Sequence, residues 1–388
     1  MIERFLIAGL IAIGGHGTNQ TQAAAPPQQS SVEKDNSNSE ASTPVELGKI
    51  DWQRDFEAAQ RLAIETHRPM LVLFDEVPGC ATCQNFGREV LSHPIVVDAA
   101  AQFIPVLIRN NVGRGGDRKL LERFNEPAWN NPVVRMMRAD GTDLVPRETG
   151  DWTAATLIRR MTAALHRSGQ TVPRWLRLVD AEWNPAEPNT ATVAMACYWE
   201  GELQLGGIEG VIGSSIGMLD GREVVEVRFD AKRVSFRDLI DQAKQMRCTN
   251  RVYARNKEQA EQAAEIVGKE LVVETELAVD DSTQQQVHLY RRPEYYLLPL
   301  TASQATKLNS LLAHAPRRLD DTKREQIEAW LSPTQRRLTR QLAAYLPKHG
   351  YVRGFEQKLD RSEIRLDRSA KGTATYFVQL ESLLNASK

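Results

Sequence analysis

The sequence predicts an α/β domain, followed by an α+β domain and a mainly helical C-terminal extension. Three observations support this prediction. Between residues 51 and 166, helical periods alternate with short continuous apolar runs, which is typical of strands buried on both faces. From residue 190 the pattern changes to alternating strands interrupted by helices. Beyond residue 300, apolar residues recur at helical spacing in 300–314 and 331–346.

Length and charge limit the possible classes of protein. A chain of 388 residues is longer than one hydrophobic core usually supports, so two or three domains are expected. Basic and acidic residues balance at 49 and 50, and aromatic residues make up 6%. This composition gives no reason to expect a nucleic-acid partner or a polyanion site.

The N-terminus has the pattern of a targeting segment. One Arg precedes an apolar stretch over 5–13, and small residues with an A-x-A-like pattern follow near 22–25. The apolar stretch is too short to span a bilayer, so we predict a signal peptide over 1–25; the alternative is a buried N-terminal helix. Residues 26–47, rich in Pro, Gln, Ser and Asn, are predicted to be a disordered linker. We therefore expect an exported protein, periplasmic or extracellular, free or membrane-tethered by an uncleaved N-terminus.

The first domain, predicted over 48–170, contains a C-x-x-C sequence, Cys80 to Cys83. A strand precedes it and a helix follows, so Cys80 is expected at a helix N-terminus, where thiolate is favoured over thiol. Cys83, one turn later, is positioned to resolve a mixed disulfide. The alternatives are half of a zinc site and two inert core cysteines. The predicted elements are a helix near 55–66, strands at 70–74 and 103–111, and a strand pair over 130–148 joined by an Asp-Gly turn.

This order of elements resembles the thioredoxin superfamily, most closely its exported branch, over about 51–166. The sequence "VPGC" is also similar to a small branch that carries selenocysteine at the position of Cys80, which implies that Cys80 attacks the substrate. The resemblance implies a cis-proline at Pro132, whose preceding residue, Asn131, offers its backbone to a substrate strand. The sequence departs from the family at Gly79, which replaces a Trp, and at Phe74, which stands where a buried aspartate is common.

Residues 171–189, broken by prolines, are predicted to be a connector, and 190–300 the second domain. A helix over 235–246 has Ser235 as its expected N-cap, with Asp238 at the capping-box position. The other predicted elements are strands at 191–199, 211–219 and 222–231 and a helix at 200–210.

The runs "ACYWEGE" and "EVVEVRFDAKRVSFRDL" of this domain resemble peptide methionine sulfoxide reductase A. The resemblance implies a ferredoxin-like α+β sheet and attack by Cys197 on a sulfoxide sulfur, which forms a sulfenic acid. Tyr198 and Trp199 would then form the apolar wall around the methyl group.

The family's segments that carry a catalytic Glu and Tyr are missing, so Glu202, Glu200 or Tyr253 are the candidates for the proton donor. The resemblance also implies that Cys248 resolves Cys197. The alternatives are a permanent Cys197–Cys248 bridge, and a buried apolar strand without chemistry at "CYW".

Together these patterns predict an exported thiol oxidoreductase without cofactor or metal. Cys80 and Cys83 would pass electrons to Cys197 and Cys248, which reduce oxidised methionine or a related sulfur group in proteins or peptides. A membrane or soluble thiol would supply the electrons, and no nucleic acid would take part. One alternative is a disulfide reductase or isomerase whose second domain only binds substrate. The other is a non-catalytic binding protein with two structural disulfides.

Overall fold

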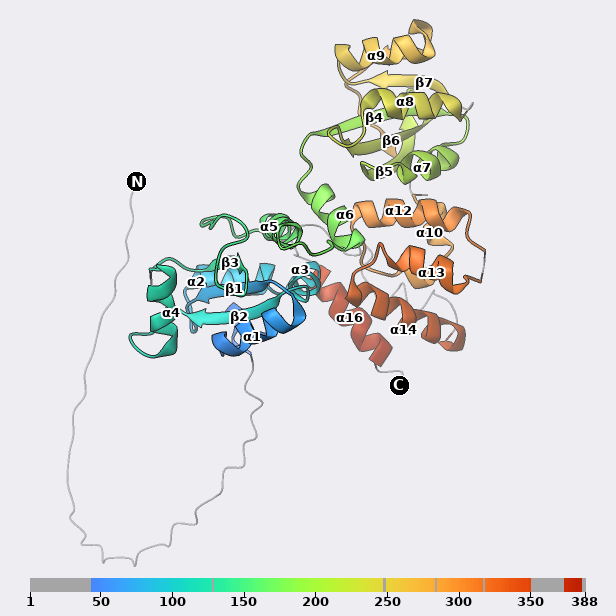
Figure 1. Ribbon diagram of the computed structural model, residues 1–388. Coiled ribbons are helices and arrows are strands. Elements are labelled where there is room, and N and C mark those ends of the chain that lie inside the picture. The colour runs from blue at the N-terminus through green and yellow to red at the C-terminus, as the bar shows by residue number, and fades with distance from the viewer. Residues whose placement is uncertain are drawn as a thin grey trace, which may run out of the picture. The chain divides into compact units, whose positions relative to one another are not determined.

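The computed structural model of the protein describes residues 43–127, 129–246, 249–282, 285–316, 318–349 and 373–385 (Figure 1). The predicted signal peptide and most of the predicted linker lie outside these residues. The last residues of that linker are structured, because Val45–Leu47 (η1) forms a 3-10 helix with Glu46 and Leu47 buried. The linker prediction therefore extended too far, since Leu47 joins the core of the first domain.

The first sheet has three strands in the order β2-β1-β3. The central strand β1 (Met70–Asp75) pairs in parallel with β2 (Ile104–Arg109) and antiparallel with β3 (Val133–Met137). The predicted strand pair after Pro132 is only half formed, because its second arm is reduced to one bridge between Met137 and Asp143. The helices of this region are α1 (Phe56–Thr66), α2 (Ala81–Asn85), a π-helical segment η2 (Phe86–Val90), α3 (Pro94–Ala100), α4 (Gly116–Phe124) and α5 (Ala154–Arg167).

Strand β1 is buried on both faces. Leu71 and Leu73 pack into the core that also contains Phe86, whereas Val72 and Phe74 pack into the core on the opposite face. Because side chains alternate along a strand, Asp75 shares the face of Leu71 and Leu73. This is the face covered by the segment that follows the cysteines.

The segment predicted as a connector contains a helix, α6 (Arg174–Trp183). Its prolines flank the helix instead of interrupting it, with Pro173 at the N-cap. The helix forms because its apolar residues fall on one face, and Trp175, Leu176, Leu178, Val179 and Trp183 are all buried.

The second sheet has six strands in the order β8-β7-β4-β6-β5-β9. The predicted β-α-β-β-α order is present and is completed by β7. Ser235 and Asp238 form the predicted capping box of α8. The strands are β4 (Pro188–Met195), β5 (Val211–Leu219), β6 (Arg222–Asp230), β7 (Thr249–Ala254), β8 (Val272–Glu274) and β9 (Asp280–Asp281), and the helices are α7 (Tyr198–Gly207), α8 (Phe236–Gln245), α9 (Lys257–Val267) and the short η3 (Lys269–Leu271).

The C-terminal region is helical, as predicted, and is coloured orange to red in Figure 1. Helix α12 packs against α7 and β5, and its start is held by Glu182, which accepts hydrogen bonds from the backbone of Ala302 and Ser303. Among the described helices, none combines the length and apolar character needed to cross a membrane. The helices are α10 (Val287–Tyr290), α11 (Pro293–Tyr296), α12 (Ala302–Ala313), α13 (Asp321–Glu328), α14 (Pro333–His349) and α16 (Thr373–Asn385).

Candidate functional site

Cys80 and Cys83 form a close dithiol where β1 gives way to α2. Their Sγ atoms lie 3.2 Å apart. Cys80 is the N-cap residue of α2 and is exposed, whereas Cys83 is fully buried. Cys80 is thus accessible to a substrate, and Cys83 is accessible mainly to Cys80.

The pKa values of the two thiols are shifted in opposite directions. The hydrogen bond that the backbone N–H of Cys83 donates to the Cys80 sulfur, followed by the contact with the Cys83 thiol, lowers the pKa of Cys80. Burial, followed by a hydrogen bond to Asp75, raises the pKa of Cys83. The exposed sulfur is therefore the one that more readily becomes a thiolate nucleophile.

Asp75 is a functional residue that the sequence analysis missed. It is fully buried, and its carboxyl group interacts with the Cys83 thiol. Burial raises the pKa of Asp75 to about 7, although hydrogen bonds from Cys83 and from the backbone of Glu76 oppose this shift. From the sequence, Phe74 was assigned to the position where the family commonly has a buried aspartate. In the structure, Phe74 packs into the core on the other face of the sheet. Strand alternation is the signal that points to Asp75 instead.

The loop between β1 and Cys80 is held by side chains from three places in the chain. Glu46, from η1, accepts a hydrogen bond of 2.7 Å from the backbone N–H of Gly79. Gln84 donates to the Gly79 carbonyl, and Asn111 donates to the Pro78 carbonyl. A Cβ on Gly79 would lie 2.4 Å from the Glu76 carbonyl oxygen and 2.7 Å from Cys83 Cβ. This contact explains why a glycine replaces the Trp usual at this position.

Pro132 directly precedes β3, and the Asn131–Pro132 peptide bond is cis, as the resemblance implied. In the β1–β3 register Phe74 faces Val133, so Pro132 comes opposite Asp75 at the end of the strand. The indole N–H of Trp152 donates to the Pro132 carbonyl at 2.9 Å, and the Asn131 side chain donates to Asn110. Neither Trp152 nor Trp129, whose side chain is 81% exposed, was predicted from the sequence as a site residue.

The dithiol also provides the one group of candidate metal ligands found among the described residues. Ligand atoms of Glu76, Cys80 and Cys83 lie within 4.8 Å of one another. Structural zinc sites in proteins almost always have four ligands. The group therefore offers one ligand fewer than such a site requires.

Cys197 is exposed and is the N-cap residue of α7. The prediction of a strand through residue 199 was wrong at its end, because β4 ends at Met195 and Tyr198 begins the helix. The rings of Tyr198 and Trp199 lie 5.6 Å apart, centroid to centroid. Glu223 accepts a hydrogen bond from the backbone N–H of Tyr198, so a carboxylate is close to the start of this helix.

Two of the three predicted proton donors of the second domain, Glu202 and Tyr253, are engaged elsewhere, whereas Glu200 is partly exposed and accepts a hydrogen bond from Gln204. Glu202 is buried and accepts hydrogen bonds from the backbone of Gln286 and the side chain of Asn309. Tyr253 is buried and donates to the carbonyl of Leu219. Cys248 lies outside the described residues. The structure thus describes three of the four cysteines and brings two of them, Cys80 and Cys83, together.

Comparisons with known proteins identify the first domain. Residues 51–139 match the thioredoxin-like family. Among solved structures, the chain is similar to one titled DsbH oxidoreductase, with 15% sequence identity, a TM-score of 0.27, and coverage of 33% of this chain and 93% of that one. No curated protein matches the chain. The chain therefore contains a thioredoxin-like domain with a C-x-x-C pair, while its second domain has no identified family.

Proposed function

We propose that the protein is a thiol–disulfide oxidoreductase that reduces disulfide bonds in protein or peptide substrates. The observation that supports this function best is the pairing of an exposed Cys80 with a buried Cys83 beside the carboxyl group of Asp75. A structural disulfide between cysteines so close in sequence would remove little entropy from the unfolded chain.

The proposed reaction begins when the Cys80 thiolate attacks one sulfur of a substrate disulfide. A Cys80–substrate bond forms, and the other substrate sulfur leaves as a thiolate that takes a proton from solvent. The Cys83 thiolate then attacks the Cys80 sulfur, and the substrate's second sulfur leaves in the same way. Two electrons have passed to the substrate, and the Cys80–Cys83 disulfide must be reduced by an external dithiol.

Asp75 has a defined role in the second step. The high pKa of the Cys83 thiol keeps its proton on sulfur until a base removes it. Asp75 titrates near pH 7 and interacts with this thiol, so its carboxylate is suited to accept the proton. Burial of both groups excludes water as the competing acceptor.

We further propose that the protein acts outside the cytoplasm, where oxidised sulfur groups accumulate and where a membrane or soluble thiol donor returns electrons to Cys80–Cys83. Asn131, Pro132 and the exposed Trp129 are proposed to bind the substrate chain. Pro132 directly precedes β3, which pairs with β1 as far as Phe74, and this position supports the proposal.

The test is reduction of insulin disulfides by the full chain with dithiothreitol as donor. Wild type should precipitate insulin faster than dithiothreitol alone. Cys80→Ser should abolish this acceleration, and reduced Cys83→Ser mixed with insulin after removal of dithiothreitol should leave a mixed disulfide on Cys80, visible as added mass. Equal rates in wild type and Cys80→Ser would contradict the proposal.

A second candidate function is reduction of methionine sulfoxide at Cys197. It is favoured by the exposed thiol at the start of α7 and by the aromatic pair Tyr198 and Trp199. The Cys197 thiol would take the sulfoxide oxygen, giving a sulfenic acid and a thioether, and a thiol would then form a disulfide with release of water. With Glu202 buried against Gln286 and Asn309, Glu223 is the better candidate for the proton donor.

This second function is tested separately with a methionine-sulfoxide peptide and dithiothreitol. Release of the thioether peptide that is lost in Cys197→Ser and kept in Cys80→Ser would establish it. Absence of thioether product with wild type leaves the second domain as a substrate-binding module of the disulfide reductase.

A further inference from the structure

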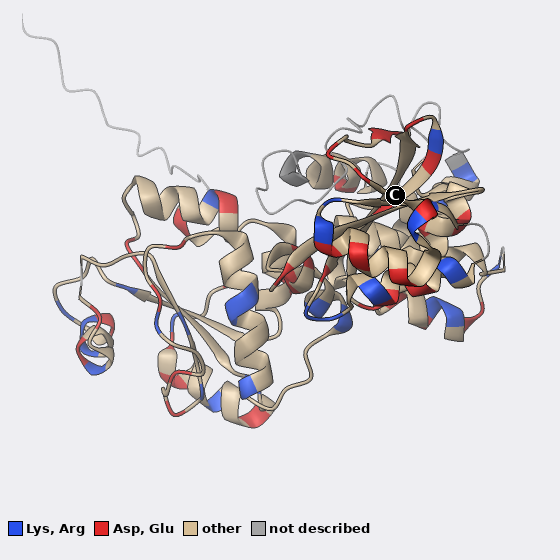
Figure 2. Cartoon of the chain, turned by 90° about the horizontal axis from the view of Figure 1, so that it is seen from above, with Lys and Arg blue, Asp and Glu red and all other residues tan. Residues whose placement is uncertain are grey.

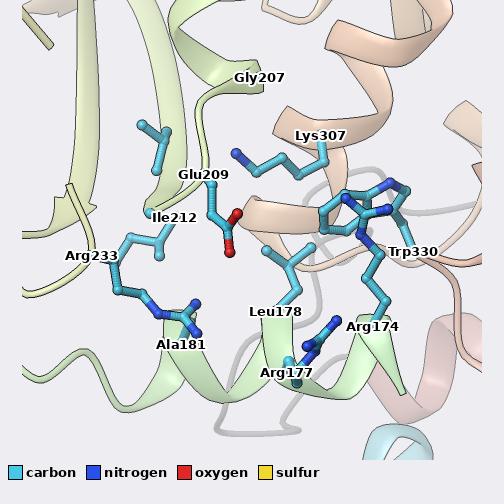
Figure 3. Close-up of a pocket in the computed structure, with 12 residues that line it drawn as sticks. Arg174, Arg177, Leu178, Ala181, Gly207, Glu209, Ile212, Arg233, Lys307 and Trp330 are labelled. Carbon is cyan, nitrogen blue, oxygen red and sulfur yellow. The ribbon is translucent and has the colours of Figure 1, made fainter. Parts of the chain in front are cut away.

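A cavity of about 380 Å³ opens between α6, the turn after α7, and α12. We call it the arginine cavity. Its charged and aromatic lining consists of Arg174, Arg177, Glu209, Arg233, Lys307 and Trp330, and Leu178 and Ile212 form part of its apolar wall. Lys307 and Glu209 extend into the cavity from opposite sides, and Arg174 lies along Trp330 (Figure 3).

The arginines of this cavity lack carboxylate partners. Among the described residues, no ion pair involves Arg174, Arg177 or Arg233, although Asp180 attracts Arg233 at longer range. Elsewhere in the described chain, basic and acidic residues are interspersed (Figure 2). With Glu209 as the one acidic residue of the lining, the cavity carries a net positive charge.

The start of α6 adds to this positive potential. Arg174 and Arg177 lie in its first turn, which holds no acidic residue, and Pro173 provides no side-chain cap. The N-terminus of a helix already carries the positive end of the helix dipole, so cations in the first turn are unfavourable without an anion nearby. A bound anion would be attracted both by these arginines and by the helix N-terminus, and would so offset the repulsion between them.

Two of the cationic groups are fixed in position. Lys307 is only 4% exposed, and its Nζ donates to the carbonyls of Gly206 and Ile208 at 2.7 and 2.5 Å. Burial lowers the pKa of Lys307 to about 7, and a bound anion would favour the charged form, whose third proton is available to a ligand. The Arg174 guanidinium stacks over Trp330 at 3.9 Å, which fixes its plane and leaves its N–H edge available for an oxyanion.

The positive lining continues beyond this cavity. An adjoining cavity of about 430 Å³ shares Arg177 and Arg233 and adds Arg159, His166 and Arg167. It also contains Asp180 and Asp230, and Asp230 already accepts hydrogen bonds from the backbone of Ala186 and Glu187. Basic residues thus line both cavities, and each cavity is large enough for a small organic molecule.

We propose that the arginine cavity binds a small oxyanion with two or more negative charges, held by Arg174, Arg177 and Arg233 with Lys307 at the inner wall. Guanidinium groups bind phosphate and carboxylate oxygens in the same paired geometry, so both groups belong to the predicted ligand class. This site uses no residue of the dithiol, and its existence does not depend on the proposed redox function.

The proposal is tested by isothermal titration calorimetry of the full chain with two probes, inorganic pyrophosphate and citrate. Arg177→Gln and Arg233→Gln each remove one positive charge from the cavity, and both side chains are exposed, so the fold should tolerate either change. The matched control is Arg61→Gln, which removes an exposed arginine from α1.

We expect at least one probe to bind wild type and Arg61→Gln equally, with affinity lowered about tenfold or more in each cavity variant. Binding of pyrophosphate alone would identify a phosphate-bearing ligand, and binding of citrate alone a carboxylate-bearing one. Two results would overturn the proposal: no binding of either probe to wild type, or equal affinity in the control and both cavity variants.

Discussion

The carboxyl group of Asp75 interacts with the thiol of Cys83, and both side chains are fully buried. This relationship couples the ionisation of the two groups, because burial penalises the charge on either one. It also connects the end of a central strand directly to the redox pair.

Replacing Asp75 with Asn should slow the resolving step and change its pH dependence. The wild-type rate of mixed-disulfide resolution should rise through about pH 7, as the Asp75 carboxylate becomes available to accept the Cys83 proton. In Asp75→Asn this rise near pH 7 should disappear, and the rate at pH 8 should fall about a hundredfold, within the range of general-base effects. Stopped-flow reduction of a model disulfide from pH 5 to 9 measures both quantities; an unchanged inflection would exclude Asp75 as the base.

The same substitution should change how stability depends on pH. Burial raises the folded-state pKa of Asp75 from 3.8 to about 7, so the folded protein holds a proton that the unfolded chain releases. The free energy of unfolding should therefore fall as pH rises from about 4 to 7, by at most about 4 kcal/mol from this group.

Urea unfolding of reduced wild type and Asp75→Asn at pH 4 and pH 8 checks this prediction. The variant should gain stability relative to wild type at the higher pH. A stability difference between Asp75→Asn and wild type that is the same at both pH values would contradict the raised pKa.

Adding a methyl group at Gly79 should disturb the dithiol loop. The new Cβ would meet the Glu76 carbonyl and Cys83 Cβ, so Gly79→Ala should lower the free energy of unfolding by about 1–3 kcal/mol and change the alkylation rate of Cys80. Gly113→Ala is the matched control, because its Cβ would meet nothing within 4 Å. Equal stability and equal alkylation rates in the two variants would show that the loop is not closely packed.

Truncating Glu202 should lower stability and leave Cys197 unchanged. The Oε2 atom of Glu202 accepts hydrogen bonds from the backbone of Gln286 and the side chain of Asn309, and Glu202→Ala leaves both buried donors without this acceptor, at a cost of about 1–3 kcal/mol. Glu200→Ala, on the same helix, should have a much smaller effect. Thermal unfolding and iodoacetamide labelling of Cys197 separate a structural role of Glu202 from a catalytic one. Unchanged stability of Glu202→Ala with loss of sulfoxide reduction would make Glu202 a catalytic residue.

Much of this architecture could be predicted from local sequence signals. The apolar run before Cys80 predicted β1, and the Ser235–Asp238 spacing predicted the capping box of α8, because both depend on residues close together in the chain. The position of Cys80 at a helix start followed from the same kind of signal.

Other features depend on contacts between distant segments. Helix α6 was not predicted, because the prolines on either side of it indicated an irregular connector. Its apolar face is stabilised by burial of Trp175 and its neighbours against distant parts of the chain. The arginine cavity joins residues of α6, α12 and the β6–α8 turn, and the balanced overall charge gave no indication of it. The role of Glu46 depends on its contact with Gly79, 33 positions later in the chain.

Equilibration of the full chain with mixtures of reduced and oxidised glutathione tests whether Cys80 and Cys83 form a reversible redox pair. Acid quenching, alkylation and mass mapping then report the state of each cysteine. We predict that one peptide, containing Cys80 and Cys83, gains and loses a disulfide reversibly as the ratio changes. If both cysteines remain thiols at every ratio, or remain joined in the presence of excess dithiothreitol, the proposed redox function is wrong.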